Sequence, residues 1–380
     1  MPSLAIIESS CESRKSNHIN TPIYRYIGSQ MLSAPALALS AGLAHASRPV
    51  SDAEASSILH QVYGIKGTLV RLGGEKDANF RVNADGGRFL LKIVAGEDPA
   101  VCDMHSQALL HLENVDPQLP TQRVVRTREG AADKTVDFGT DDVRFVRLVT
   151  FVEGAMQRNT PQTQRQRKNA GAMLARLQVA LSGFRHPADG HKLTWDMCHA
   201  ADLVEPTKRL RDGGALADAL EKFRMEVLSR QAQLPFQAVH NDLNSDNIVV
   251  DPHDTDRVIG IIDFGDMVRS ARVFDLAVGA AYQATAAEDP LSACRDFIEG
   301  FALVQPLVPA ECDALYSTIL ARMAQRIAIT EIRAELFPEN RDYILRNTSL
   351  VRRQFDRLAS LSPAVAQASL SSTCQTTRTN

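Results

Sequence analysis

The sequence lacks most features that mark secreted, membrane or nucleic-acid-binding proteins. Its six cysteines are scattered, with no C-x-x-C pair and no spacing typical of metal ligands, so we expect reduced thiols in a cytoplasmic protein. No apolar run is long enough to span a membrane. The formal net charge of -3 gives no general electrostatic case for binding nucleic acid or an anionic membrane. What is left is an ordinary globular composition, 44% hydrophobic over 380 residues, enough for two lobes with buried cores.

The two ends of the chain differ from the rest in composition. Residues 1–48 are predicted to be a disordered extension, because 1–30 are polar and mildly basic. Ala34–Ala46 resembles the apolar part of a signal peptide but lies too far from Met1. A transit sequence, or a true start at Met31, stays open for residues 1–30. The Ser/Thr/Ala-rich residues 362–380 are predicted to be a disordered tail.

Residues 49–153 predict a first lobe built on an antiparallel sheet. Ser51 and Glu54 are capping residues that open a helix ending near Tyr63, where Gly64 stops it. A second helix starts at Asp98-Pro99 and runs to about Glu113. Alternating or apolar runs of strand length predict strands at Gly67–Leu72, Ala78–Val82, Arg88–Val94, Val124–Arg128, Thr135–Phe138 and Val143–Phe151.

Three features of this part of the chain are typical of nucleotide binding. Gly73 and Gly74 lie in a tight turn, whose backbone N–H groups can contact phosphates, although an ordinary hairpin turn explains them equally well. Lys92 is a cation inside an apolar strand, and burying a cation alone is costly. An edge-strand lysine is the alternative, but we favour one that binds nucleotide phosphates. Thr150 and Val152 belong to the natural hinge, where backbone groups could contact a purine base.

The second half is organised around a motif from His240 to Asp266. It contains H-x-D-x-x-x-x-N, an apolar run, a turn, a second apolar run and the sequence IDFGD. Phosphoryl transfer needs one carboxylate that faces the acceptor hydroxyl, and an Asn and a second carboxylate that hold metal ions. We therefore assign Asp242 to the hydroxyl, and Asn247 and Asp263 to the metal. A turn aspartate and a core histidine would explain an isolated H-x-D, but the joint occurrence of both motifs favours a site.

The spacing around this motif predicts its geometry. Phe236–Val239 and Asn247–Val250 read as strands, and a turn at 252–256 returns the chain through Val258–Ile262. The side chains of Asn247 and Asp263 could then point into one cleft.

The rest of residues 154–361 predicts a helical second lobe. Asp275 opens one helix, either as its cap or by holding the backbone of the catalytic loop. The stretch from Asp266 to Asp275 is too short for a segment that would dock a protein substrate, which points to a small-molecule acceptor. Further helices are predicted at Pro161–Leu181, Ala215–Gln233, Leu291–Phe301, Pro309–Ile332 and Asp342–Leu361.

Together these motifs resemble the aminoglycoside phosphotransferase/choline kinase superfamily and, within it, the hydroxylysine kinases. The similarity runs from about Val62 to Asn347 and includes the EKDANF, RLVTF, HNDLNSDN and IIDFGD segments. It implies an α+β, bilobed, protein-kinase-like fold with a small antiparallel-sheet N-lobe and a larger helical C-lobe. It also implies Mg²⁺ at Asn247 and Asp263, ATP or GTP as donor, Lys92 on the phosphates and Asp242 as the base-like residue.

The chain departs from the superfamily pattern at two places. Asn241 stands where glycine is usual, and Asn is the residue besides glycine that best tolerates a left-handed backbone. No clear glutamate partner exists for Lys92, for which Asp103 is the nearest candidate, with His105 and Gln107 adjacent.

The resemblance implies phosphorylation of a hydroxyl on a small amino acid or amino alcohol, with 5-hydroxylysine as the first candidate. An ammonium-bearing acceptor favours carboxylates near the cleft, so Asp266 and Asp196, with Trp195, are candidate substrate residues. Phosphorylation of an aminoglycoside, homoserine or a choline-like alcohol is the nearest alternative. A pseudokinase is disfavoured by the complete set of Asp242, Asn247 and Asp263.

Overall fold

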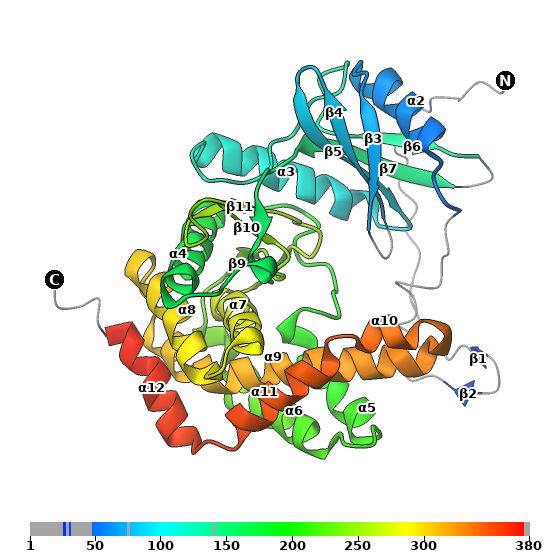
Figure 1. Cartoon of the computed structure of the whole chain (residues 1–380). Coiled ribbons are helices and arrows are strands. Elements are labelled where there is room, and N and C mark those ends of the chain that lie inside the picture. Colours follow the sequence, from blue (N-terminus) through cyan, green and yellow to red (C-terminus); the bar gives the residue numbers. More distant parts are fainter. Residues whose placement is uncertain (1–25, 28–29, 32–47, 74–76, 140–141, 376–380) are drawn as a thin grey trace. The chain divides into compact units, whose positions relative to one another are not determined.

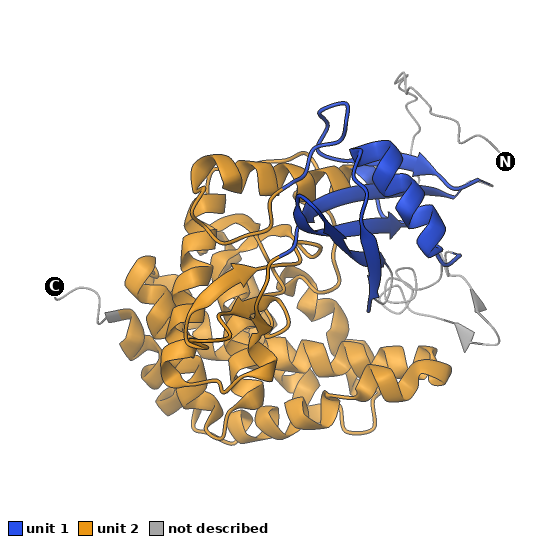
Figure 2. Ribbon diagram, turned by 45° about the horizontal axis from the view of Figure 1, so that its top comes forward, with its two compact units in different colours: residues 1–99, 124–151 blue, residues 100–123, 152–380 orange. Residues whose placement is uncertain are grey.

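A computed structural model describes residues 26–27, 30–31, 48–73, 77–139 and 142–375, which form two compact units (Figure 1). The first unit comprises the described residues within Met1–Pro99 and Val124–Phe151, and the second comprises those within Ala100–Arg123 and Val152–Asn380 (Figure 2). The predicted α+β class is confirmed, with a five-stranded antiparallel sheet in the first unit and a mostly helical second unit. The predicted lobe boundary differs at residues 100–123, which we placed in the first lobe but which belong to the second unit.

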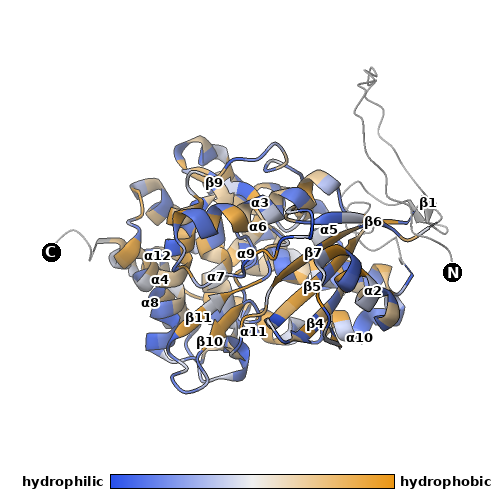
Figure 3. Cartoon of the chain, turned by 90° about the horizontal axis from the view of Figure 1, so that it is seen from above, coloured by the Kyte–Doolittle hydropathy of each residue, from blue (hydrophilic) through white to orange (hydrophobic). Residues whose placement is uncertain are grey.

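The sheet of the first unit has the strand order β3-β4-β5-β7-β6. Its strands are β3 (Thr68–Leu72), β4 (Ala78–Ala84), β5 (Gly87–Ala95), β6 (Lys134–Asp137) and β7 (Val143–Thr150), and all neighbours are antiparallel. Figure 3 shows β5 and β7 coloured as largely hydrophobic, as expected for central strands. The predicted strand at 124–128 is wrong, because Val124 makes only an isolated bridge to Val149.

Helix α2 (Asp52–Tyr63) covers this sheet with an apolar face. Leu59 on the helix and Phe80, Leu91 and Leu148 on the strands share one buried core. Burial of large apolar side chains gives the unit a core of its own.

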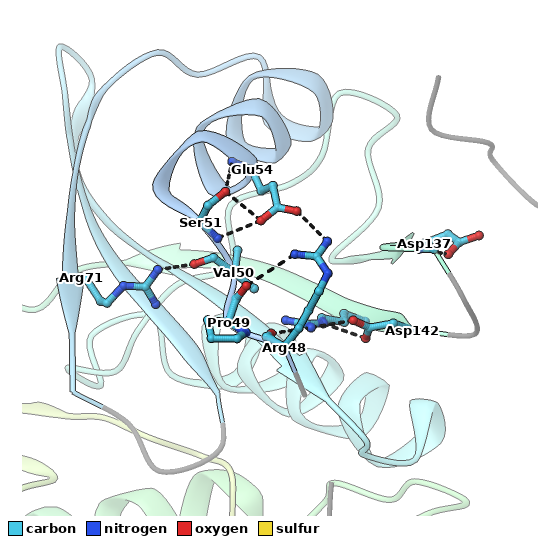
Figure 4. Close-up of polar contacts among 10 residues, drawn as sticks. Arg48, Pro49, Val50, Ser51, Glu54, Arg71, Asp137 and Asp142 are labelled. Atoms are coloured by element: carbon cyan, nitrogen blue, oxygen red, sulfur yellow. Dashed lines mark hydrogen bonds and ion pairs between the residues drawn. The ribbon is translucent and has the colours of Figure 1, made fainter. Parts of the chain in front are cut away.

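The start of α2 is held by a dense set of polar contacts (Figure 4). The predicted capping box is present, because the backbone N–H of Ser51 donates to Glu54 Oε2 at 2.8 Å and that of Glu54 donates to Ser51 Oγ at 3.2 Å. Arg48 pairs with Glu54 at 2.6 Å, and Arg71 donates to the carbonyl of Val50. The helix ends as predicted at Gly64, whose φ of 71° is left-handed.

The second unit contains most of the helices. They are α3 (Pro99–Val115), α4 (Gln164–Leu181), α5 (Val204–Lys208), α6 (Gly214–Glu226), α7 (Arg272–Ala286), α8 (Pro290–Val304), α9 (Pro309–Leu336), α10 (Arg341–Leu345), α11 (Thr348–Ala359) and α12 (Pro363–Gln375). Short 3₁₀ turns lie at Gln157–Asn159 (η1), Met197–Leu203 (η2), Leu228–Gln233 (η3) and Pro338–Asn340 (η4). The predicted helix at 342–361 is thus interrupted, and that at 215–233 ends in η3.

Two helices organise the packing of this unit. Helix α8 packs against α4, α7 and α12, and α9 packs against α6, α7, α11 and α12. Helices α4 and α8 approach closely at two glycines, since a Cβ at Gly171 would lie 1.9 Å from Phe297 O, and one at Gly300 would lie 1.9 Å from Lys168 O.

Small strand pairs carry the loops of the second unit. Strands β10 (Ile248–Val250) and β11 (Val258–Ile261) form a hairpin, and β8 (Ala155–Met156) adds to its other edge. Strand β9 (Phe236–Val239) pairs with β12 (Val268–Ala271).

The prediction of a disordered tail at 362–380 is wrong for residues 363–375. These residues form α12, in which Ala366, Leu370 and Cys374 are buried. Their spacing of four residues places them on one helical face. That face packs on α8 and α9, and this burial outweighs the weak composition signal.

Most of the predicted N-terminal extension, 1–48, lies outside the described residues, and Tyr26–Ile27 (β1) pairs with Gln30–Met31 (β2). Among the described residues, no helix is long and apolar enough to cross a membrane.

Candidate active site

The predicted strand–turn–strand around the central motif is present in the second unit. Strand β10 pairs antiparallel with β11, and Ile248 lies opposite Ile261. One residue further, the backbone N–H of Ile262 donates to Asn247 O at 3.0 Å. Asn247 and Asp263 therefore stand at the same end of this hairpin.

Asp242 and Asn247 are in direct contact. Asn247 Nδ2 donates to the backbone O of Asp242 at 2.8 Å and to its Oδ2 at 2.9 Å. Asn244 Nδ2 also donates to Asp242 Oδ2, at 2.8 Å. The two amides fix the orientation of the Asp242 carboxylate. Because Nδ2 is the atom that donates in both hydrogen bonds, Oδ1 is left as the acceptor of the Asn247 amide.

Negative charge accumulates around Asp242. The pKa of Asp242 is raised to about 8, mainly by desolvation and also by the neighbouring Asp266 and Asp263 carboxylates, whereas the hydrogen bond from Asn244 and the charge of Arg322 act to lower it. An acidic cluster of this kind is stabilised by a cation.

The residues present suit a magnesium ion. Carboxylate and amide oxygens, such as Asp263 Oδ and Asn247 Oδ1, are hard ligands of the kind that Mg²⁺ prefers. Within the described residues no group of three or more His, Cys, Asp or Glu is placed to hold a metal. A magnesium ion here would therefore take few protein ligands and complete its shell with water and phosphate oxygens.

His240 supports the loop from within the core. It is fully buried, and its Nε2 lies 3.1 Å from Ile262 O. Its Nδ1 accepts from the backbone N–H of Asp242 at 3.3 Å, which assigns the proton to Nε2. Burial lowers the pKa of His240, so a neutral ring is favoured. Its ring also packs edge-on against Phe264, with centroids 4.9 Å apart.

Two loop residues hold a left-handed backbone. Asn241 (φ 64°) and Asp263 (φ 63°) are the non-glycine residues with positive φ in the described part of the chain. The structure thus confirms the left-handed backbone that the usual glycine at position 241 implied.

Asp275 holds this loop in place. Its Oδ1 accepts from the backbone N–H of Asn241 at 2.8 Å, and its Oδ2 accepts from Gln178 Nε2 at 2.9 Å. Ala271, not Asp275, occupies the N-cap position of α7, so the second of the two predicted roles is correct. Gln178 was not predicted as a loop contact. Gln122 was not predicted either, and its Oε1 accepts from the backbone N–H of Asp263 at 3.3 Å. Neither glutamine belongs to a sequence motif, and both contacts join distant parts of the chain.

In the first unit, Lys92 lies in the middle of the sheet. Strand β5 runs between β4 and β7, which excludes the edge-strand alternative. Lys92 Nζ lies 3.5 Å from Asp77 Oδ2, and Asp77 is a partner that we did not predict. The predicted candidate, Asp103, belongs to the second unit and there contacts His186 Nε2 at 3.0 Å.

The other residues predicted to bind the nucleotide lie near the ends of strands or outside the described part of the chain. Gly73 directly follows β3, and Gly74 lies outside the described residues. Thr150 is the last residue of β7, and Val152 is the first residue of the second unit after it.

The three residues predicted to bind the acceptor differ in burial and in their contacts. Asp196 is only 2% exposed and caps η2, since its Oδ1 accepts from the backbone N–H of Cys198 at 3.1 Å and from Ser270 Oγ at 2.6 Å. Its carboxylate is thus engaged within the fold, which contradicts a substrate contact. Trp195 is half-buried, and its carbonyl accepts from Arg322 Nη1 at 2.7 Å. Asp266 is half-buried and close enough to act on Asp242.

Comparisons with known proteins identify the family of the chain. Residues 68–307 match a family model described as "Phosphotransferase enzyme family" (APH). The chain is 26% identical over 330 residues to hydroxylysine kinase from Mus musculus, which covers 78% of this chain and 86% of that protein.

Two solved structures share the fold. A microcompartment-associated aminopropanol kinase has a TM-score of 0.64 at 18% identity, covering 85% of this chain and 99% of that one. An amicoumacin kinase in complex with AMP-PNP, Ca²⁺ and Ami has a TM-score of 0.63 at 10% identity, covering 82% and 93% of the two chains.

Proposed function

Since the chain belongs to the APH phosphotransferase enzyme family, we propose that it phosphorylates a hydroxyl group of a small amino acid or amino alcohol, with 5-hydroxylysine as the first candidate. The observation that carries this proposal is the contact of Asp242 with Asn247 beside Asp263 at one end of the β10–β11 hairpin. The likeness to a hydroxylysine kinase supports the choice of acceptor.

Asp242 is proposed to accept a hydrogen bond from the acceptor hydroxyl and so to aim its oxygen at the terminal phosphorus. A bond forms between that oxygen and the phosphorus, while the bond to the bridging oxygen breaks and the nucleoside diphosphate leaves with the electron pair. The hydroxyl proton passes to Asp242 late in the step. Positioning and charge stabilisation supply most of the acceleration.

The donor is proposed to be ATP or GTP. An amicoumacin kinase of the same fold was solved with AMP-PNP, which supports a nucleoside triphosphate. Asn247 Oδ1 and the Asp263 carboxylate would hold Mg²⁺, which when bound neutralises charge on the bridged phosphates. In the first unit, Lys92 is proposed to bind donor phosphates. Backbone groups at Gly73, Gly74, Thr150 and Val152 are proposed as further donor contacts.

The test is an acceptor panel run with ATP and with GTP in the presence of Mg²⁺. Hydroxylysine, homoserine, aminopropanol, an aminoglycoside and choline are each assayed for release of nucleoside diphosphate above the acceptor-free rate. Phosphorylation of a small amino acid or amino alcohol is expected. A chain that binds nucleotide but phosphorylates none of these acceptors would be a pseudokinase.

The role of Asp242 is tested by Asp242→Asn, which keeps the side-chain shape but removes the charge. Turnover is expected to fall by about 10²–10⁴-fold, with nucleotide binding by calorimetry nearly unchanged. The matched control is Asp246→Asn in the same loop, because Asp246 is exposed and pairs with Arg158 at 2.8 Å. Wild-type turnover in the Asp242 variant would remove the assignment.

A further inference from the structure

Two arginines of α9 are candidate anion-binding residues. Arg322 and Arg326 are four residues apart, so they lie on the same face of the helix. Neither forms a salt bridge within the residues that the structure describes. Arg322 is only 2% exposed, and charged groups are rarely buried without a partner.

The guanidinium of Arg322 is held in place but not saturated. Its Nη1 donates to Trp195 O at 2.7 Å and to Gln325 Oε1 at 2.9 Å, and its guanidinium carbon lies 5.4 Å from the centre of the Trp195 ring. Its Nε is buried and has no hydrogen-bond partner. A guanidinium has five N–H donors, so the fold positions this group and leaves donors for a partner from outside the chain.

Arg326 is placed in a similar way. Its guanidinium carbon lies 4.3 Å from the centre of the Tyr282 ring on α7. A guanidinium stacked on an aromatic face keeps the N–H groups at its edge available to an acceptor in its plane.

A series of contacts connects these arginines to the region around the candidate catalytic carboxylate, Asp242. Strands β9 and β12 are antiparallel, with Val239 opposite Val268, so Asp242 and Asp266 leave the same end of this pair. Strand β12 is tied to the segment that precedes η2, because Ser270 Oγ donates to Asp196 Oδ1. The neighbouring Trp195 is the residue that Arg322 contacts.

The electrostatics agree with this placement. The charge of Arg322 lowers the pKa of Asp242, whereas Asp266 raises it. The pKa of the Tyr282 hydroxyl is raised mainly by burial and also by Asp242 and Asp266, and both arginines lower it. Tyr282 is therefore within reach of two acidic and two basic side chains at once.

We propose that Arg322 and Arg326 bind the carboxylate of the acceptor, which makes the preferred acceptor a hydroxy amino acid. This inference rests on the proposed kinase function and narrows its acceptor class. Asp266 takes the ammonium group of the same molecule. An amino alcohol leaves the buried Arg322 unpaired, and a polycationic aminosugar or choline places more positive charge beside both arginines.

The test uses matched acceptors that differ in the carboxylate alone. 5-Hydroxylysine is compared with its carboxamide, and homoserine with its carboxamide, in the full-length protein with Mg²⁺ and the better nucleotide. Because losing the carboxylate leaves charged donors unpaired, kcat/KM is expected to be on the order of 10²-fold higher for the acid of the better pair.

Two variants assign this preference to the arginines. Arg322→Gln is expected to raise KM for the acid by about 10²-fold and to lower kcat/KM far more for the acid than for the carboxamide, so that the preference collapses. Arg326→Gln, at a half-buried position with less risk to folding, is expected to have a smaller effect in the same direction. The control is Arg295→Gln, at an exposed position on α8, and thermal unfolding checks that each variant is folded.

The outcomes separate this inference from the proposed function. Equal use of acid and carboxamide by the wild-type protein overturns the inference and leaves the kinase function standing. An equal loss of kcat on both acceptors in Arg322→Gln also overturns it, because the arginine would then act on the transferring phosphoryl group. A protein that phosphorylates no acceptor loses the proposed function and this inference together.

Discussion

At the scale of single residues, two features of Asn241 lower the stability of the fold. Its φ of 64° is unfavourable for a side chain with a Cβ, and its Oδ1 and Nδ2 are both buried without a hydrogen-bond partner. Asn241→Gly removes both features and keeps the backbone N–H that Asp275 accepts. Since glycine loses more entropy on folding, we expect a net gain of about 1 kcal/mol in the free energy of unfolding.

The comparison that isolates the backbone is Asn241→Ala. It removes the polar atoms but keeps the Cβ in the left-handed region, so it should be less stable than the glycine variant by about 1 kcal/mol. Urea unfolding of the three proteins measures this difference. A glycine variant no more stable than the alanine variant would show that the backbone at position 241 is not strained.

Glu54 gives the first unit a predictable pH dependence. The hydrogen bond from Arg48, followed by those from Ser51, lowers the pKa of Glu54 to about 2, below its ordinary value of 4.5. A carboxylate with a lowered pKa stabilises the fold above its unfolded pKa, and this contribution is lost as the pH falls from about 4.5 to about 2. Glu54→Gln should therefore cost about 0.5–1 kcal/mol at pH 7, and the cost should shrink towards pH 3.

The measurement is urea unfolding of wild type and Glu54→Gln between pH 7 and pH 3. Glu113→Gln, at an exposed position on α3, is the control and should show no such trend. A difference between wild type and Glu54→Gln that stays constant down to pH 3 would contradict the capping and ion-pair role of the carboxylate.

At the scale of elements, the crossing of α4 and α8 depends on glycine. A Cβ at Gly171 would lie 1.9 Å from Phe297 O, and a backbone oxygen can move only if the helices separate. Alanine is the better helix former by about 1 kcal/mol, but the overlap outweighs this gain. We expect Gly171→Ala to lower the free energy of unfolding by about 2–3 kcal/mol.

Gly190 supplies the control, since a Cβ there meets nothing within 4 Å. Thermal unfolding should leave Gly190→Ala close to wild type and lower the midpoint clearly for Gly171→Ala. A Gly171→Ala protein as stable as wild type would mean that α4 and α8 do not approach as closely as described.

Elements with a strong local signal were predictable from the sequence. The cap at Ser51, the apolar strands β5 and β7 and the β10–β11 hairpin follow from residues that are adjacent in sequence. Helix α12 was missed because its Ala/Ser/Thr-rich composition is typical of disorder, and only packing on α8 and α9 favours the helix. The pairings of Asp275 with Gln178 and of Lys92 with Asp77 need the fold itself, since nothing in the sequence pairs these residues.

At the scale of the whole molecule, neither unit is one continuous stretch of the sequence. Residues 100–123 lie between two stretches of the first unit in the sequence but belong to the second unit. A cut at the predicted lobe boundary therefore separates α3 from the rest of the second unit. The second unit would then lack the hydrogen bonds and ion pairs that join Asp116 to Arg176, Asp103 to His186, His111 to Ala180 O, Pro120 O to Ile261 N, and Gln122 to Asp263 N.

We therefore expect a fragment of residues 152–380 to be unstable on its own. Two of these interactions are at or beside the candidate catalytic hairpin, and Leu109 and Leu112 of α3 are buried in the intact protein. Joining residues 100–123 to residue 152 through a flexible Gly/Ser linker should restore a cooperative thermal transition, followed by far-UV circular dichroism. A fragment without this segment that unfolds as cooperatively, and at the same temperature, would mean that α3 is not an integral part of the second unit.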